Sequence, residues 1–321
     1  MIRPIQYLRG IAAMMVVWHH SVDILGAGSG FGASGVDLFF VISGFIMVAS
    51  TERGVTPGEF MLHRIVRVVP LYWCATLLIV ALAIAHVSFK YDVIDLETVG
   101  KSLLFIPYES PTHPGQLWPL LVPGWTLNYE MFFYALFALS LFAAAKWRLI
   151  WIGAIFVCLV SAGYMFGPLH GVQSVYTDPR LLEFVAGMVV ARLWLKGLVW
   201  HWGLGVLGIV AGFALLAIDN KAALIVGATL VVWGSLSKEI REVNFNLLFE
   251  IGNASYSIYL THIFTLIVIR AVLPHGLPSI LASMCICAAV GYGGYRFIER
   301  PMTQMLRRSR QRAAVPLPDA P

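Results

Sequence analysis

The sequence predicts an all-α fold, a polytopic membrane bundle of about ten transmembrane helices. Hydrophobic residues make up 59% of the 321 residues and charged residues only 12%, whereas a soluble domain is typically about 25% charged. Apolar runs of about 20 residues, the length of a helix that crosses a bilayer, recur from one end of the chain to the other. Because no polar block is long enough to fold by itself, we expect one membrane domain.

The ten expected spans follow the apolar runs, and the short ones among them require tilt or close packing. The first run is interrupted by Arg9 and has no small-residue cleavage site, so we interpret it as a retained span and not as a signal peptide. In chain order the spans cover residues 5–25, 35–51, 68–88, 129–146, 149–166, 180–196, 200–217, 221–236, 254–273 and 279–298.

The longest connection, residues 89–128, is rich in proline. Proline lacks a backbone N–H and clashes with the preceding turn, so this segment cannot be one continuous helix. It also contains Trp118 and Trp125, and tryptophan favours membrane interfaces. The segment is therefore predicted to form a re-entrant or interfacial cap.

Most of the 22 lysines and arginines fall on one side of the predicted bundle. Cytoplasmic loops carry this excess, so both termini and the loop containing Arg53 are expected in the cytoplasm. Arg9 then lies toward the cytoplasm, whereas His20 and the segment around Thr112 lie toward the outside.

We expect the membrane domain to cover residues 1–303 and residues 304–321 to form a basic, disordered cytoplasmic tail. The arginines of this tail predict attraction to anionic membrane lipids. The net charge of +5 resides in short loops and the tail, so no nucleic-acid partner is expected. The four cysteines lack the spacing of a zinc or thioredoxin site. The sequence therefore predicts no metal and no tightly bound cofactor.

Arg9 and His20 lie eleven residues apart within the first span. On a helix this spacing turns through about 1100° and rises roughly 16 Å, which places both side chains on one face. Ionisable residues in a membrane span are costly and usually mark a functional path. The pair predicts a polar channel with a permanent cation at one end and a titratable base at the other.

His20 is the candidate catalytic base, because imidazole titrates near neutrality. The alternative is a histidine hydrogen-bonded at the outer interface. His19 points about 100° away around the helix and is the weaker candidate.

Arg64 and Arg67 are three residues apart, hence neighbours on a helix face. With Arg9 they are expected to form a cytoplasmic cationic cluster. The planar forks of guanidinium groups suit phosphate recognition. The alternative is ordinary anchoring by the positive-inside rule.

Two carboxylates near the expected depth of His20 are further candidates. Asp37 lies at the start of the second span. It is expected either to be a partner of His20 or to be a carboxylate at the membrane interface. Glu130 enters the fourth span, where it would orient His20, contact an acceptor hydroxyl or remain solvated.

Other ionisable residues have weaker assignments. Arg180 and Glu183 have the spacing of a helical ion pair. His262 lies in mid-span, where burial raises the odds of a functional role without making it the favoured reading.

Together these residues resemble the acyltransferase-3 family of membrane O-acyltransferases, over the range Tyr7 to Pro301. We also expect the stand-alone form, without an extracytoplasmic SGNH-type hydrolase domain, similar in length and opening to bacterial exopolysaccharide acetyltransferases such as those acting on succinoglycan. The motifs that carry the resemblance are Arg9-x10-His20, Gly35–Phe45, Arg64-x-x-Arg67 with Pro70 and Tyr72, Trp125-x4-Glu130, Ser255–His262 and Glu299-Arg300-Pro301.

The resemblance implies transfer of an acetyl or similar short acyl group from acyl-CoA to a carbohydrate hydroxyl in the bacterial inner membrane. The acceptor would be an exopolysaccharide or its lipid-linked oligosaccharide precursor, with polysaccharide-assembly machinery as a partner. Acetyl-CoA would be a substrate that enters from the cytoplasm. The family's arginine–histidine pair carries over to Arg9 and His20, and its arginine pair to Arg64 and Arg67. Direct transfer and an acyl-enzyme both stay open.

A proton-coupled transporter or flippase of a glycan or small metabolite is the alternative, because intramembrane arginine and histidine also mark transport. No repeat symmetry between the two halves is evident, which disfavours it. A non-catalytic scaffold is disfavoured by the set of ionisable residues within the spans.

Overall fold

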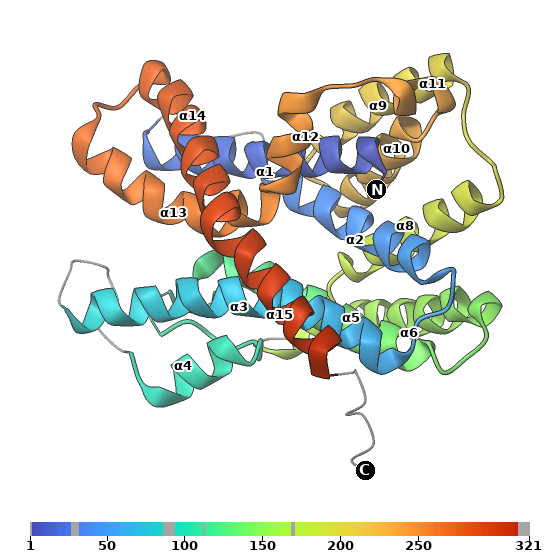
Figure 1. The fold of residues 1–321 in the computed structure, drawn as a ribbon, viewed down its shortest axis with the longest axis horizontal. Helices are drawn as coiled ribbons and strands as arrows, with labels where there is room; N and C mark the ends of the chain where they lie inside the picture. Colours follow the sequence, from blue (N-terminus) through green and yellow to red (C-terminus); the bar gives the residue numbers. More distant parts are fainter. Residues whose placement is uncertain (1, 27–31, 86–93, 112, 168–170, 314–321) are drawn as a thin grey trace, which may run out of the picture.

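The computed structural model describes residues 2–26, 32–85, 94–111, 113–167 and 171–313. All regular structure in these ranges is helical, so the all-α prediction is confirmed. Each of the ten predicted spans corresponds to a helix (Figure 1). These helices are α1 (Arg3–Ile24), α2 (Gly35–Thr51), α3 (Pro57–Ile84), α5 (Trp125–Ser140), α6 (Ala145–Met165), α8 (Leu181–Leu195), α9 (Trp202–Leu216), α10 (Lys221–Ser235), α13 (Ser255–Val272) and α14 (Leu277–Gly294).

Several helices have the length and composition of membrane spans. Among the described residues, four are long and apolar enough to cross a bilayer, namely α3, α6, α13 and the continuous helix Leu277–Leu306. The apolar helices α2, α9 and α10 are shorter, with 17, 15 and 15 residues. The helix α1 has 22 residues, but Arg9 and two histidines make it more polar. The number of ten spans stays a prediction.

Short helices lie in the connections, namely α4 (Leu96–Leu103), η1 (Val122–Gly124), α7 (Gln173–Tyr176), α11 (Lys238–Glu242) and α12 (Asn246–Asn253). After α14 the chain continues as η2 (Tyr295–Glu299) and α15 (Arg300–Ala313). The described part of the proline-rich connection holds only α4 and η1, as expected of a segment that cannot be one helix. Thr112 lies outside the described residues.

The start of α3 differs from the prediction. The apolar run begins near residue 68, whereas the helix begins at Pro57. Thr56 and Glu59 form a capping box there, and proline is favoured in the first turn of a helix. Arg64 and Arg67 therefore lie inside α3, four residues and one residue before the apolar run.

Glycines allow α2 and α8 to approach closely. A β-carbon on Gly44 would collide with the backbone of Phe184, and one on Gly187 would collide with the backbone of Val41. Small residues at helix interfaces permit such backbone contact in membrane bundles. Because one face of α2 packs against α8, the rotation of α2 about its own axis is fixed.

The C-terminal helices form one long element that runs obliquely across α3 (Figure 1). Its middle turn, η2, is a π-helix, and Glu299 at its end is buried and accepts a hydrogen bond from Ser257 Oγ at 2.6 Å. Residues 304–313 of the expected tail belong to α15, which ends at Ala313. The sequence there is rich in Arg, Gln, Met and Leu, all strong helix formers. Residues 314–321 lie outside the described ranges.

Candidate functional site

A cavity of about 470 Å³ lies between α1, α2, α3, α5 and α13; we call it the central cavity. Along α2 its lining extends from Val36 to Ser50. At the helical rise of 1.5 Å per residue this distance is about 21 Å. The cavity is therefore long enough for an extended ligand.

Three predicted arginines converge on this cavity. Arg9 comes from α1, and Arg64 and Arg67 come from α3. Among the described residues none of the three has a carboxylate within ion-pair distance. With three arginines against one carboxylate, Glu130, in its lining, the cavity has an excess of positive charge, which is costly unless an anion binds.

Two polar atoms at the cavity wall also lack partners. Arg64 Nε and Ser255 Oγ are buried and have no hydrogen-bond partner within the described part of the chain. Arg64 is held in place by its aromatic neighbours, with its Cζ 5.8 Å from the ring centre of Phe60 and 6.0 Å from that of Tyr134. Buried polar groups normally find partners, so these two atoms are candidates for hydrogen bonds to a ligand.

Glu130 lines the same cavity. Its Oε1 accepts hydrogen bonds from Ser43 Oγ at 3.2 Å and from the Tyr134 hydroxyl. Ser43 lies on α2, so Glu130 joins α2 to α5. The structure therefore places this carboxylate beside the arginines, and its hydrogen bonds are with these two hydroxyls rather than with His20.

His20 is not among the residues that line the central cavity. Its ring stacks on that of His262, with ring centres 5.2 Å apart, and its other ring neighbour is His19 at 5.0 Å. Tyr259 lies 6.0 Å from His262 by ring centres, and this tyrosine lines the cavity. A single aromatic layer thus separates the cavity from the histidine pair.

That layer is fixed by hydrogen bonds. The Tyr259 hydroxyl is 2.9 Å from Thr126 Oγ1 and donates to the Pro123 carbonyl at 3.0 Å. Phe39 packs edge-on against Tyr259, with ring centres 5.8 Å apart. A polar channel was predicted between Arg9 and His20. The structure has an open cavity at the Arg9 end, whereas side chains close the path at the His20 end.

His262 is fully buried, and its position defines its tautomer. Its Nδ1 lies 2.6 Å from the Tyr259 carbonyl oxygen, which can only accept, so Nδ1 carries the proton. In the neutral imidazole Nε2 is then the acceptor, and it has no partner among the described residues. The sequence marked His262 as a mid-span histidine, but only the fold places it against His20.

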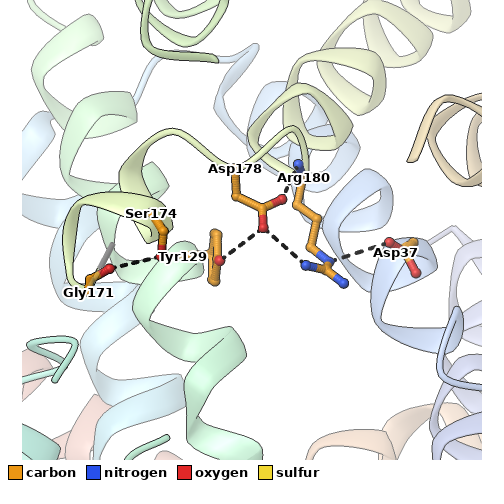
Figure 2. A network of polar contacts seen from close by, with 6 residues as sticks. All are labelled: Asp37, Tyr129, Gly171, Ser174, Asp178 and Arg180. Carbon is orange, nitrogen blue, oxygen red and sulfur yellow. Dashed lines mark hydrogen bonds and ion pairs between the residues drawn. The ribbon is translucent and has the colours of Figure 1, made fainter. Parts of the chain in front are cut away.

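Asp37 lies in a different polar network, drawn in Figure 2. Its Oδ1 is 3.7 Å from Arg180 Nε, and Arg180 Nη1 is 3.2 Å from Asp178 Oδ2. Glu183 is completely buried and interacts with Asp37. Arg180 thus forms its ion pairs with Asp178 and Asp37 rather than with Glu183. The neighbours of Asp37 favour a structural role over partnership with His20.

The chain is similar to known proteins over most of its length. A family described as "Acyltransferase domain", of the acyltransferase-3 type, matches residues 3–295. The chain is 43% identical over 309 residues to "Exopolysaccharide production protein ExoZ" of Rhizobium meliloti (strain 1021), covering 91% of this chain and 95% of the relative. No solved structure matches the chain.

Two further relatives are more distant. "Protein 2 in picA locus" of Rhizobium radiobacter is 30% identical over 149 residues, 41% of this chain and 78% of that protein. "Putative membrane-bound transacylase BcsY" of Komagataeibacter xylinus is 30% identical over 206 residues, 60% of this chain and 51% of that protein.

Proposed function

The chain belongs to the acyltransferase-3 family of membrane acyltransferases, and from this premise we propose that it transfers an acetyl or similar short acyl group from acyl-CoA to a carbohydrate hydroxyl. The acceptor is an exopolysaccharide or its lipid-linked precursor, since the relative with 43% identity is named for exopolysaccharide production. The protein works as a multi-pass protein of the bacterial inner membrane.

The observation that carries the proposal is the convergence of Arg9, Arg64 and Arg67 on one elongated cavity. Coenzyme A is an extended molecule with several phosphate charges at one end and a thioester at the other. Guanidinium groups bind phosphate oxygens with paired hydrogen bonds. The phosphates would bind at the Arg64 and Arg67 end, with the arm directed along α2 toward Tyr259.

His20 is the proposed base for the transfer step. In direct transfer, His20 takes the proton of the acceptor hydroxyl as the oxygen attacks the thioester carbonyl. The C–S bond then breaks, the CoA thiolate leaves and takes up a proton, and the acetyl ester remains on the sugar. For this step the thioester must pass the layer formed by Tyr259 and Phe39, which points to a side-chain movement when the donor binds.

Reconstitution tests this function. Purified protein in proteoliposomes should bind acetyl-CoA and transfer the radiolabelled acetyl group to polysaccharide from a strain that lacks the protein. The transporter alternative makes the opposite prediction, glycan or metabolite movement driven by a proton gradient without an acetylated product. Failure to bind acetyl-CoA, with the protein correctly inserted, would exclude the acyl-CoA donor.

The orientation of the bundle gives a separate prediction. Cysteines replacing Arg53 and Pro114, both exposed, can be introduced in a background without the four native cysteines. An impermeant maleimide added to intact cells should label the cysteine at Pro114 and not the one at Arg53, because the excess of basic residues marks the Arg53 side as cytoplasmic. The reverse pattern would place Arg64 and Arg67 on the side without CoA and exclude the proposed donor path.

A further inference from the structure

A second cavity, of about 300 Å³, lies on the other side of α5 from the central cavity; we call it the Trp118 cavity. Trp125 and Tyr129, four residues apart on one face of α5, line it together with Trp118. Glu130, on the other face of this helix, lines the central cavity instead. The first turns of α5 thus form a wall shared by two cavities.

Polar side chains complete the Trp118 cavity. Gln116 comes from the proline-rich connection, and Arg180 comes from the start of α8. Arg180 lies over the ring of Trp125, with its Cζ 5.3 Å from the ring centre. Tyr129 donates a hydrogen bond to Asp178 Oδ2 at 3.4 Å. Figure 2 shows Arg180 between Asp178 and Asp37, which hold the guanidinium from two sides.

The two cavities differ in charge. The central cavity has three arginines and one carboxylate, Glu130, which forms no ion pair with them among the described residues, whereas Arg180 pairs with both Asp178 and Asp37. The Trp118 cavity therefore offers donors and acceptors without an excess of positive charge. An anion is the expected occupant of the first cavity and a neutral polar molecule that of the second.

We propose that the Trp118 cavity binds a neutral sugar ring of the acceptor, an inference that rests on the proposed function and adds the place of the carbohydrate. Because Arg180 covers one face of the Trp125 ring, Trp118 is the main apolar surface for the C–H face of a pyranose, and Trp125 adds to the apolar lining. The Gln116 amide and the Arg180 guanidinium are planar groups suited to adjacent hydroxyls. The volume lies at the lower end of the range for small-molecule sites, which fits one ring of a longer chain.

The binding site can be tested with the natural acceptor. Oligosaccharides are released from the surface polysaccharide of a strain lacking the protein, and their binding to the wild-type protein is followed by saturation-transfer NMR. The variant Trp118→Ala should lose most of this signal and raise the KM for the acceptor about tenfold or more, through loss of an aromatic contact surface. Its KM for acetyl-CoA should stay within about twofold of wild type, because Trp118 does not line the central cavity.

Two further variants complete the test. Trp118→Phe keeps an aromatic face and should retain most of the binding. Trp151→Ala is the matched control, because this tryptophan is exposed on α6 and does not line the Trp118 cavity. Thermal unfolding in detergent should be alike for all three proteins.

The outcomes separate this inference from the proposed function. An acceptor KM and an NMR signal in Trp118→Ala equal to those of Trp151→Ala would overturn the sugar site while acetyl transfer stands. Saturation transfer that depends on Trp118, in a protein that never uses acetyl-CoA, would leave the sugar site and exclude acyl-CoA as the donor. Binding of only acidic oligosaccharides would contradict the neutral ligand.

Discussion

His20→Ala should reduce acetyl transfer by about 10²- to 10⁴-fold, the usual contribution of a general base. His20 and Arg9 share one face of α1, and the rings of His20 and His262 are stacked. The hydroxyl oxygen of a sugar is a weak nucleophile until its proton is removed, so loss of the imidazole should act mainly on kcat. The measurement is the rate of radiolabelled ester formation in proteoliposomes at saturating acetyl-CoA.

The control is the neighbouring histidine. His19→Ala should have a smaller effect, because His19 lies off the face shared by Arg9 and His20. Acetyl-CoA affinity and thermal unfolding of both variants should match wild type. Equal losses in both variants would point to a structural effect at this end of α1, and His20→Ala activity within about twofold of wild type would remove His20 from the mechanism.

The apolar runs predicted the helices well, because burial in a bilayer requires long apolar segments. The start of α3 was placed too late, because hydropathy alone does not register a capping box. The signal was present in the sequence, since Thr56, Pro57 and Glu59 have the spacing of a helix N-terminus. A reading of local caps beside hydropathy would have placed the start of this helix at Pro57.

The arginines of the site could be predicted because each stands out as a cation beside or within an apolar run. Their convergence on one cavity required the fold. The partners of the carboxylates could not be predicted, because they depend on how close the helices approach. Asp37 meets Arg180 across the α2–α8 contact, whose distance is set by Gly44 and Gly187. Helical spacing within α8 favoured Glu183 as the partner of Arg180, and tertiary contact decided otherwise.

The contact between His20 and His262 could not be predicted from the sequence either. His20 and His262 lie on α1 and α13, far apart in the sequence, and no periodicity joins them. The unprotonated Nε2 of His262 follows from a single contact with the Tyr259 carbonyl. Such a tautomer is a property of the packed structure, so it is accessible only after the helices are placed.

Arg64→Ala and Arg67→Ala should each weaken acetyl-CoA binding by about 10- to 100-fold, since a hydrogen bond to a charged group contributes about 1.5–3 kcal/mol. The Arg64 guanidinium is positioned by Phe60 and Tyr134 and has a buried Nε without a partner in the described structure. A phosphate would satisfy this atom. Calorimetric titration of acetyl-CoA into the purified protein measures the Kd directly.

Lysine substitutions distinguish a phosphate site from simple charge. Arg64→Lys and Arg67→Lys keep the cation but lose the planar fork, so we expect only partial recovery of affinity. Arg53→Ala serves as the matched control, because Arg53 is exposed in the loop before α3 and does not line the central cavity. The same weakening in Arg53→Ala would indicate a diffuse electrostatic effect that disappears at high salt. Unchanged Kd values in the Arg64 and Arg67 variants would leave these arginines as anchors of topology, and the donor would then have to bind outside the central cavity.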